Sequence, residues 1–185
     1  MSPQLFTIGH STHPLDRFLA LLTQQHIEVV ADIRRFPGSR KYPQFNRDGL
    51  ATSLPEAGIE YHWLAALGGR RAKKTNGPST NLGLRNESFR NYADYMHTEG
   101  FREGVRELLA VASGRPTAFM CSESVFWRCH RRLVADYLLV NGITVQHIMP
   151  SGVLRPHTLT DGARVEAGAL TYPQPDEADQ GIVAE

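Results

Sequence analysis

The chain has 185 residues, of which 41% are hydrophobic, and a formal net charge of +1, values that suit one globular domain with a full core. No apolar run approaches the roughly 18 residues of a membrane span, and the start MSPQLF has no basic segment ahead of an apolar stretch, so we expect neither a membrane partner nor a signal peptide. The two cysteines lie eight positions apart, one ending a predicted strand and one in the next predicted helix, which favours free thiols and a cytoplasmic location.

The charge is unevenly distributed along the chain. Residues 34–74 carry nine Lys or Arg side chains against three acids, whereas the last dozen residues carry four acids and no cation. Basic loops with an acidic tail favour a polyanionic partner or an anionic substrate, and an ordinary solvated surface is the alternative.

Short apolar runs alternate with amphipathic segments over the first 150 residues. The apolar and β-branched runs predict strands at 5–8, 27–33, 60–64, 117–121 and 144–148. Helical spacing predicts helices at 15–22, 47–54, 89–97, 100–112 and 128–140, with Pro55 limiting the second. The segment 72–87 is rich in Gly, Asn, Ser and Thr and predicts a mobile flap that would order over a ligand.

This alternation predicts a single α/β domain over residues 1–172, with a mostly parallel sheet of about five strands and helices on both faces, as in Rossmann-like three-layer folds. Residues 173–185 are expected to form a flexible acidic tail. Ligands of such sheets bind outside the carboxyl ends of the strands, so we expect a functional cleft there. Four predicted strands deliver polar or glycine residues to this edge: His10 and Ser11; Asp32, Arg34 and Arg35; Gly68, Gly69 and Arg70; and Cys121 and Glu123.

The densest cluster of chemically active residues is AFMCSESVFWRCHRR, at 118–132. The short polar residues at 122–124 suit the capping of a helix. A helix start favours acids and disfavours cations, yet three arginines follow in the predicted first turns. Because local rules are most often broken at functional sites, we expect an anionic ligand or Glu123 close to these arginines.

Six separated motifs run through the chain in the order TIGHST, DIRRFPGSR, PQFN, LGGRR, NYADYM and MCSESVFWRCHRRLVADYL. Together they resemble a bacterial family known as domain of unknown function 488, and the resemblance covers nearly the whole chain to about Pro150. The family pattern of Cys-x-Glu followed by Cys-His-Arg fits Cys121, Glu123, Cys129, His130 and Arg131. The resemblance implies a compact α/β domain and, as the family's name says, no agreed activity.

Cys121 is one candidate reacting group. A thiol at a strand end, beside a helix N-terminus and arginines, has its thiolate favoured, as in cysteine phosphatases and sulfurtransferases. The loop of those enzymes ends in an Arg six positions on, where this chain has Trp127, with Arg128 one step later. Glu123 would also disfavour a thiolate, and a small buried cysteine is the alternative interpretation.

Glu123 is a second candidate, as a general base or nucleophile, because nearby arginines favour its charged form. Asp32 would then be a second carboxylate across the cleft, and His10 a proton carrier. Paired carboxylates beside a phosphate-binding rim would suit cleavage of an N-glycosidic bond in a nucleotide or nucleic acid. Alternatively, Glu123 caps the helix and pairs with Arg128 or Arg131.

Cys129 and His130 are adjacent, so on a helix their side chains would point about 100° apart. Cys129 shares an apolar stripe with Leu133 and Tyr137, which favours a core cysteine. A zinc site from Cys121, Cys129 and His10 is the alternative, although the spacing is not that of known structural sites. We expect no metal and no cofactor.

The sequence therefore predicts an enzyme, a hydrolase or transferase, that acts on a phosphate-bearing substrate such as a nucleotide, DNA or RNA. Its predicted catalytic residues are Glu123, His10, Asp32 and Cys121. The alternatives are a non-catalytic nucleic-acid-binding module and a cysteine-dependent transferase or phosphatase-like enzyme that uses Cys121. Forked guanidinium groups and glycines suit phosphate contact. The predicted binding residues are Ser11, Arg34, Arg35, Ser39, Asn46, Gly68, Gly69, Arg70, Arg128, His130 and Arg131.

Overall fold

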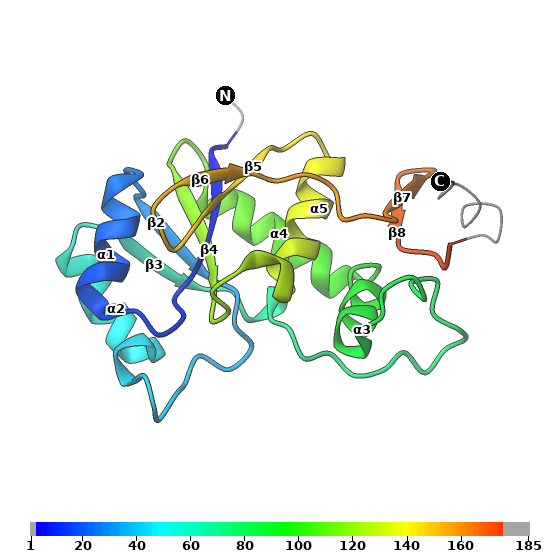
Figure 1. The fold of residues 1–185 in the computed structure, drawn as a ribbon, viewed down its shortest axis with the longest axis horizontal. Helices are drawn as coiled ribbons and strands as arrows, with labels where there is room; N and C mark the ends of the chain where they lie inside the picture. Colours follow the sequence, from blue (N-terminus) through cyan, green and yellow to red (C-terminus); the bar gives the residue numbers. More distant parts are fainter. Residues whose placement is uncertain (1–2, 176–185) are drawn as a thin grey trace, which may run out of the picture.

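The structure, a computed structural model, describes residues 3–175. Its centre is a six-stranded sheet in the order β3-β2-β4-β1-β5-β6 (Figure 1). The strands are β1 (Leu5–Gly9), β2 (Val29–Asp32), β3 (Glu60–Trp63), β4 (Thr117–Cys121), β5 (Val145–Ile148) and β6 (Leu154–Pro156). The first five pair in parallel, and β6 runs antiparallel to β5. The predicted α/β class with a mostly parallel sheet is therefore confirmed.

Helices cover both faces of this sheet. They are α1 (Leu15–Gln24), α2 (Arg47–Glu56), α3 (Glu87–Tyr95), α4 (Glu99–Val111) and α5 (Arg131–Val140). Leucines of α1 and α2 pack on one face against Ile8, Val30 and Met120, whereas α3, α4 and α5 pack on the other against Phe119 and Val145. Burial on both faces explains why β1, β2 and β4 are nearly continuous apolar runs. Within the described residues, no helix is both long and apolar enough to cross a membrane.

The strand order reverses between β1 and β4. The chain leaves β1 toward β2 on one side, whereas it leaves β4 toward β5, which lies on the other side of β1. In open parallel sheets, ligands bind at such a switch point, outside the carboxyl ends of the two strands. The two strand ends stay paired beyond the sheet, because the His10 N–H donates to the Cys121 carbonyl at 3.0 Å and the Ser11 N–H to the Ser122 carbonyl at 2.9 Å.

The helix predicted at 128–140 begins later than expected. A short 3₁₀ turn, η3 (Phe126–Arg128), comes first, Cys129 is extended with φ −131° and ψ 148°, and α5 begins at Arg131. Of the three arginines expected in its first turns, Arg128 therefore lies before α5, whereas Arg131 and Arg132 are its first two residues. The helix predicted at 47–54 continues two residues further, because α2 includes Pro55 in its last turn and ends at Glu56.

The C-terminal part of the chain has strands that the sequence pattern did not predict. These are β6 and a hairpin of β7 (Arg164–Glu166) and β8 (Ala169–Thr171), whose Leu170 is buried in the main core. Of the tail predicted at 173–185, residues 176–185 lie outside the described part of the chain.

The segment predicted as a flap, 72–87, has no helix or strand before α3 and contains two buried residues, Asn81 and Leu84. Asn81 donates from Nδ2 to Asp94 Oδ1 at 2.7 Å and accepts at Oδ1 from the Tyr172 N–H at 2.9 Å. The middle of this segment is thus tied both to α3 and to the end of the C-terminal hairpin.

Candidate functional site

A cavity of about 730 Å³ opens at the carboxyl edge of the sheet, at the switch point between β1 and β4. The loops after β1, β2, β3 and β4 and the start of α3 line it. Most of the residues predicted for the site lie in this lining: His10, Ser11, Arg34, Arg35, Ser39, Gly69, Arg70, Cys121, Glu123, Arg128 and His130. The structure leaves Asp32, Asn46, Gly68 and Arg131 outside the lining.

Asp32 lies beneath the cavity, fully buried in an ion pair with Arg34. Its Oδ1 accepts from Arg34 Nε at 2.9 Å, and its Oδ2 accepts from Arg34 Nη2 and from the Tyr61 hydroxyl, both at 2.7 Å. Burial and the adjacent carboxylate raise the pKa of Tyr61, so this hydroxyl stays a donor. Asp32 therefore fixes the position of Arg34 and has no direct access to a ligand in the cavity.

His10 is held as a neutral imidazole between two partners. Its ring stacks on Phe45 with centroids 4.4 Å apart, and its Nδ1–H donates to the Ser11 carbonyl at 2.9 Å. Its Nε2 therefore accepts from Arg34 Nη1, at 3.2 Å. Burial is the main cause that lowers the pKa of His10, and Arg34 lowers it further. To carry a proton, this side chain would first have to separate from Arg34.

Backbone contacts hold the turn that carries Glu123. Gly9 approaches it so closely that a Cβ at this position would lie 1.7 Å from the Glu123 carbonyl oxygen. The buried guanidinium of Arg131 donates to the carbonyls of Glu123, at 2.7 Å, and Ser124, at 3.1 Å. Arg131 therefore binds Glu123 through its backbone carbonyl and does not form the expected ion pair with its carboxylate. The Glu123 carboxylate is exposed and has no hydrogen bond or ion pair with any described residue, and it does not cap α5, which begins eight residues later.

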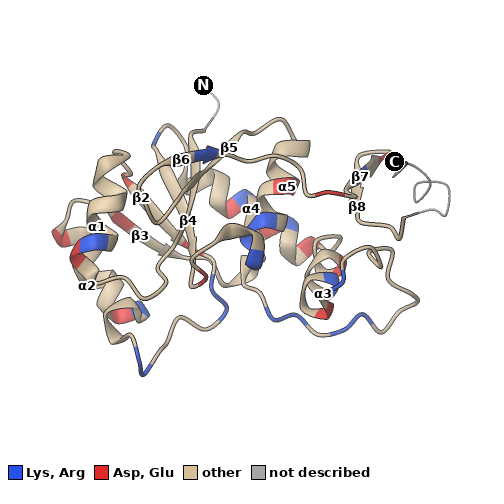
Figure 2. Ribbon diagram, viewed as in Figure 1, with Lys and Arg blue, Asp and Glu red and all other residues tan. Residues whose placement is uncertain are grey.

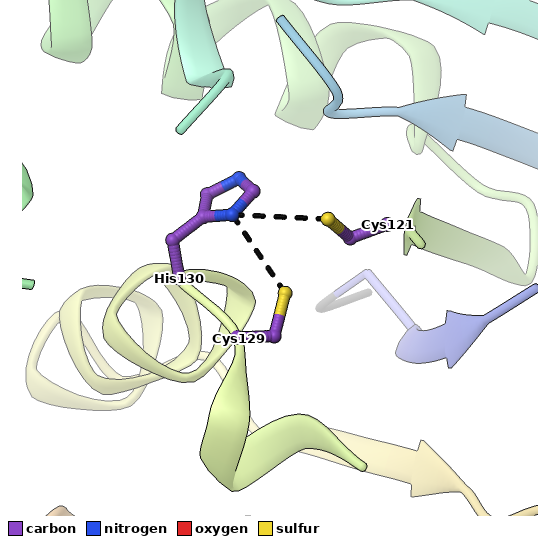
Figure 3. Close-up of side chains that lie close together, drawn as sticks. All are labelled: Cys121, Cys129 and His130. Carbon is purple, nitrogen blue, oxygen red and sulfur yellow. Dashed lines mark hydrogen bonds between the residues drawn. The ribbon is translucent and has the colours of Figure 1, made fainter. Parts of the chain in front are cut away.

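Two sulfurs and an imidazole meet on the floor of the cavity. The His130 Nδ1 lies 3.8 Å from Cys121 Sγ and 3.7 Å from Cys129 Sγ (Figure 3). The expected divergence of Cys129 and His130 is wrong because Cys129 is extended and precedes the helix, so both side chains turn toward Cys121. The zinc alternative named His10, whereas the structure gathers His130 with the two cysteines.

The two thiols differ in acidity. A hydrogen bond from the Cys129 thiol is the main cause that holds the pKa of Cys121 well below its ordinary value, against the effect of burial, and interactions with His130 and Arg131 lower it further. Burial is the main cause that raises the pKa of Cys129 well above the ordinary value. Without a metal, Cys121 is therefore the group that becomes a thiolate, and Cys129 is its hydrogen-bond donor.

Arginines surround the mouth of the cavity, and the basic segments of Figure 2 include the loops after β2 and β3. Arg70 and Arg128 are exposed, and their side chains have no hydrogen bond or ion pair with described residues. Arg35 donates to the Arg70 carbonyl and lies over the ring of Phe36, which is 68% exposed. Arg70 has a φ of 58° and Ser11 a φ of 48°, left-handed values that cost energy for non-glycine residues and cluster at functional sites.

The sequence prediction missed the contribution of α3. Asn86, Ser88, Phe89 and Tyr92 line the cavity, and Tyr92 meets the edge of the His130 ring with centroids 4.9 Å apart. The Tyr92 hydroxyl donates to the Leu67 carbonyl at 2.6 Å and so fixes the loop before Gly69. The NYADYM motif was a signal for this helix, but periodicity alone does not show which face of α3 meets the cleft.

Comparison with protein-family models gives a match. The model described as "Domain of unknown function DUF488" matches residues 14–138, more than half of the chain. Comparison with curated proteins and with solved structures gives no match.

Proposed function

Because this chain belongs to the family described as Domain of unknown function DUF488, whose name assigns no activity, we propose its function from the cavity itself. We propose that the protein is an enzyme acting on a phosphate-bearing substrate, either a nucleotide or a nucleic-acid strand. Arg35, Arg70 and Arg128 would hold the phosphate, and the reacting bond would lie over Cys121 and Glu123.

The charge of the cavity wall carries this proposal. Arg70 and Arg128 present guanidinium groups that no described residue pairs, and Glu123 is the one carboxylate among the described lining residues. Guanidinium groups bind the oxygens of a phosphate in bidentate fashion. Arg34 contributes less, because Asp32 already pairs its charge.

Aromatic side chains in the wall favour a substrate that has a base as well as a phosphate. Phe36 is largely exposed beside Arg35, and Phe89 and Tyr42 also line the cavity. Exposed aromatic faces next to cations are platforms on which bases stack. The volume of about 730 Å³ lies within the range of small-molecule sites and accommodates a nucleotide.

Glu123 is the best placed acid–base group for this reaction. Its carboxylate is exposed to the cavity, whereas both oxygens of Asp32 are occupied below it. In the cleavage of an N-glycosidic bond, Glu123 would act as the general base that takes a proton from the attacking water. Asp32 would hold Arg34 in position in the cavity wall. In this proposal Asp32 is a positioning residue.

Fluorescence anisotropy of labelled single- and double-stranded oligonucleotides, at two salt concentrations, tests the binding step. We expect affinity that falls steeply with salt, since phosphate contacts release counterions. Arg70→Gln and Arg128→Gln should each lower affinity and reduce the salt slope by about 1. Arg85→Gln is the matched control, since Arg85 is also exposed but lies outside the cavity lining. Absence of binding to oligonucleotides and to nucleotides at low salt would refute the proposal.

Assays for base loss and strand cleavage in the bound oligonucleotide separate an enzyme from a binding module. Glu123→Gln should abolish turnover by an enzyme while affinity is kept or improved, because the change removes a negative charge near phosphate. Turnover of Glu123→Gln equal to that of the unmodified protein would remove the role of this carboxylate. Binding without any turnover would favour the non-catalytic module.

A further inference from the structure

The ligand atoms of Cys121, Cys129 and His130 all lie within 4.8 Å of one another. We propose that these three side chains bind one zinc ion and leave its fourth coordination position open to the cavity. The site goes beyond the proposed function, because zinc could bind here whatever the substrate.

The separations already resemble those in a zinc site. Tetrahedral zinc, with Zn–S near 2.3 Å and Zn–N near 2.05 Å, separates a sulfur from a nitrogen ligand by about 3.6 Å. The Nδ1 of His130 lies 3.8 Å from Cys121 Sγ and 3.7 Å from Cys129 Sγ. Small side-chain movements would therefore suffice to close the three groups on an ion.

The imidazole is oriented as in metal sites. The Nε2–H of His130 donates to the Ile33 carbonyl at 3.1 Å, which places the lone pair on Nδ1, between the two sulfurs (Figure 3). Metal-binding histidines are commonly fixed by such a bond from the other ring nitrogen. Without a metal, this single lone pair faces two sulfurs and can accept a hydrogen from only one of them. A zinc ion replaces both thiol protons and bonds all three atoms.

The fold, rather than a spacing motif, brings the ligands together. Cys121 ends β4, the extended Cys129 precedes α5, and His130 is the N-cap residue of α5. The Arg131 N–H donates to Cys129 Sγ at 3.5 Å, a contact that suits a thiolate ligand. His10 does not join the group, because Ser11 and Arg34 occupy its two ring nitrogens.

The fourth position distinguishes a reactive zinc from a structural one. All three ligands line the cavity, and no fourth Cys, His, Asp or Glu of residues 3–175 belongs to the cluster. Three protein ligands with an open position are typical of catalytic zinc, whose bound water loses a proton near neutral pH. Two thiolates and an imidazole favour zinc over harder cations such as Mg²⁺. Glu123 lines the same cavity and is its one carboxylate among the described lining residues.

Metal titration of the reduced, untagged, metal-stripped protein tests the site. We expect Co²⁺ to bind at one ion per chain, with the ligand-field bands of a tetrahedral site and thiolate-to-cobalt charge transfer, and Zn²⁺ to displace it. A spectrum without thiolate charge transfer, or no uptake at one equivalent, would overturn the proposal. Because the unmodified protein gives this readout, the test does not depend on a variant that folds.

Variants then assign the ligands. Cys121→Ser, Cys129→Ser and His130→Gln should each weaken Zn²⁺ binding by about 100-fold or more, since even outer-shell changes cost 10- to 100-fold. His10→Gln, a change in the same cavity outside the cluster, should keep the affinity. Loss of binding in His10→Gln with retention in His130→Gln would overturn the assignment.

Zinc binding is measured without substrate, and oligonucleotide binding is measured on the metal-stripped protein. Failure of one therefore does not imply failure of the other.

Discussion

Burial changes the protonation of single side chains outside the cavity lining as well. The Asp136 carboxylate accepts from the His157 Nε2–H at 2.8 Å, so the His157 Nδ1 accepts from the His147 Nε2–H at 2.9 Å. The His147 Nδ1 in turn accepts from the Thr7 hydroxyl, at 2.7 Å. This buried chain of hydrogen bonds joins β1, β5 and α5, and its direction follows from the carboxylate at its end.

Burial, with lesser contributions from His157, Arg131 and Arg155, lowers the pKa of His147 from 6.5 to about 3. Between these values the unfolded chain binds a proton that the folded chain does not. The contribution of His147 to the free energy of unfolding should therefore be complete above pH 6.5. As the pH drops toward 3 this contribution should fall, by at most about 1.4 kcal/mol per pH unit.

Urea unfolding at a series of pH values from 7 to 5, on the unmodified protein and on His147→Gln, measures this contribution. Glutamine does not titrate, so the variant should show a flatter dependence on pH. Its amide can still donate to His157 and accept from Thr7, which keeps the chain of hydrogen bonds. His97→Gln changes an exposed histidine and should keep the slope of the unmodified protein. Parallel curves for all three proteins would contradict the assignment.

At the scale of elements, the close approach of β1 to the turn after β4 shapes the site. Gly9 leaves no room for a Cβ, and Arg131 reaches back from α5 to the same turn. These two contacts fix the backbone between Cys121 and Ser124, and with it the wall that carries Glu123. The turn is thus positioned by neighbouring elements, since no helix begins directly after it.

Gly9→Ala tests this coupling. The added Cβ would overlap the Glu123 carbonyl, so either β1 or the turn has to move, and overpacking of this kind costs about 1–3 kcal/mol. Urea unfolding should show the loss of stability, and oligonucleotide affinity should fall because the cavity wall shifts. Gly38→Ala is the matched control, since a Cβ there meets nothing within 4 Å although Gly38 also lines the cavity. Equal stability of the two variants would refute the coupling.

At the scale of the whole molecule, the C-terminal segment closes the core around α5. Tyr172 follows the β7–β8 hairpin, is 1% exposed, and donates to Asp136 Oδ2 at 2.7 Å. Its backbone N–H donates to Asn81, in the segment before α3. One residue after β8 therefore connects the hairpin, α5 and the long loop that leads to the cavity.

Tyr172→Phe should remove one buried hydrogen bond to a carboxylate and lower the free energy of unfolding by about 1.5–3 kcal/mol. Thermal and urea unfolding measure the change. Tyr137→Phe is the control, because the Tyr137 hydroxyl makes no hydrogen bond within residues 3–175, and it should have little effect. An equal effect of both changes would mean that the Tyr172 hydroxyl does not hold the segment in place.

Local sequence signals were sufficient where the chain's own periodicity decides the structure. The apolar runs of β1, β2 and β4 and the spacing of α1 and α4 predicted these elements, because burial on both faces of a parallel sheet demands such patterns. The alternation of strands and helices then placed most candidate residues at one edge of the sheet. The short strands β6, β7 and β8 have no comparable pattern and were missed.

The sequence by itself determined the α/β architecture and the edge of the sheet where polar residues gather. Only the tertiary structure decided which of those residues face the cavity. Asp32 and Arg34 are two positions apart, but only Arg34 lines the cavity, because the Asp32 carboxylate is buried in an ion pair with Arg34. Cys129 joins Cys121 and His130 because α5 begins at Arg131 and leaves Cys129 extended. Side-chain direction depends on where an element begins and on what packs against it, and hydrophobic periodicity carries neither piece of information.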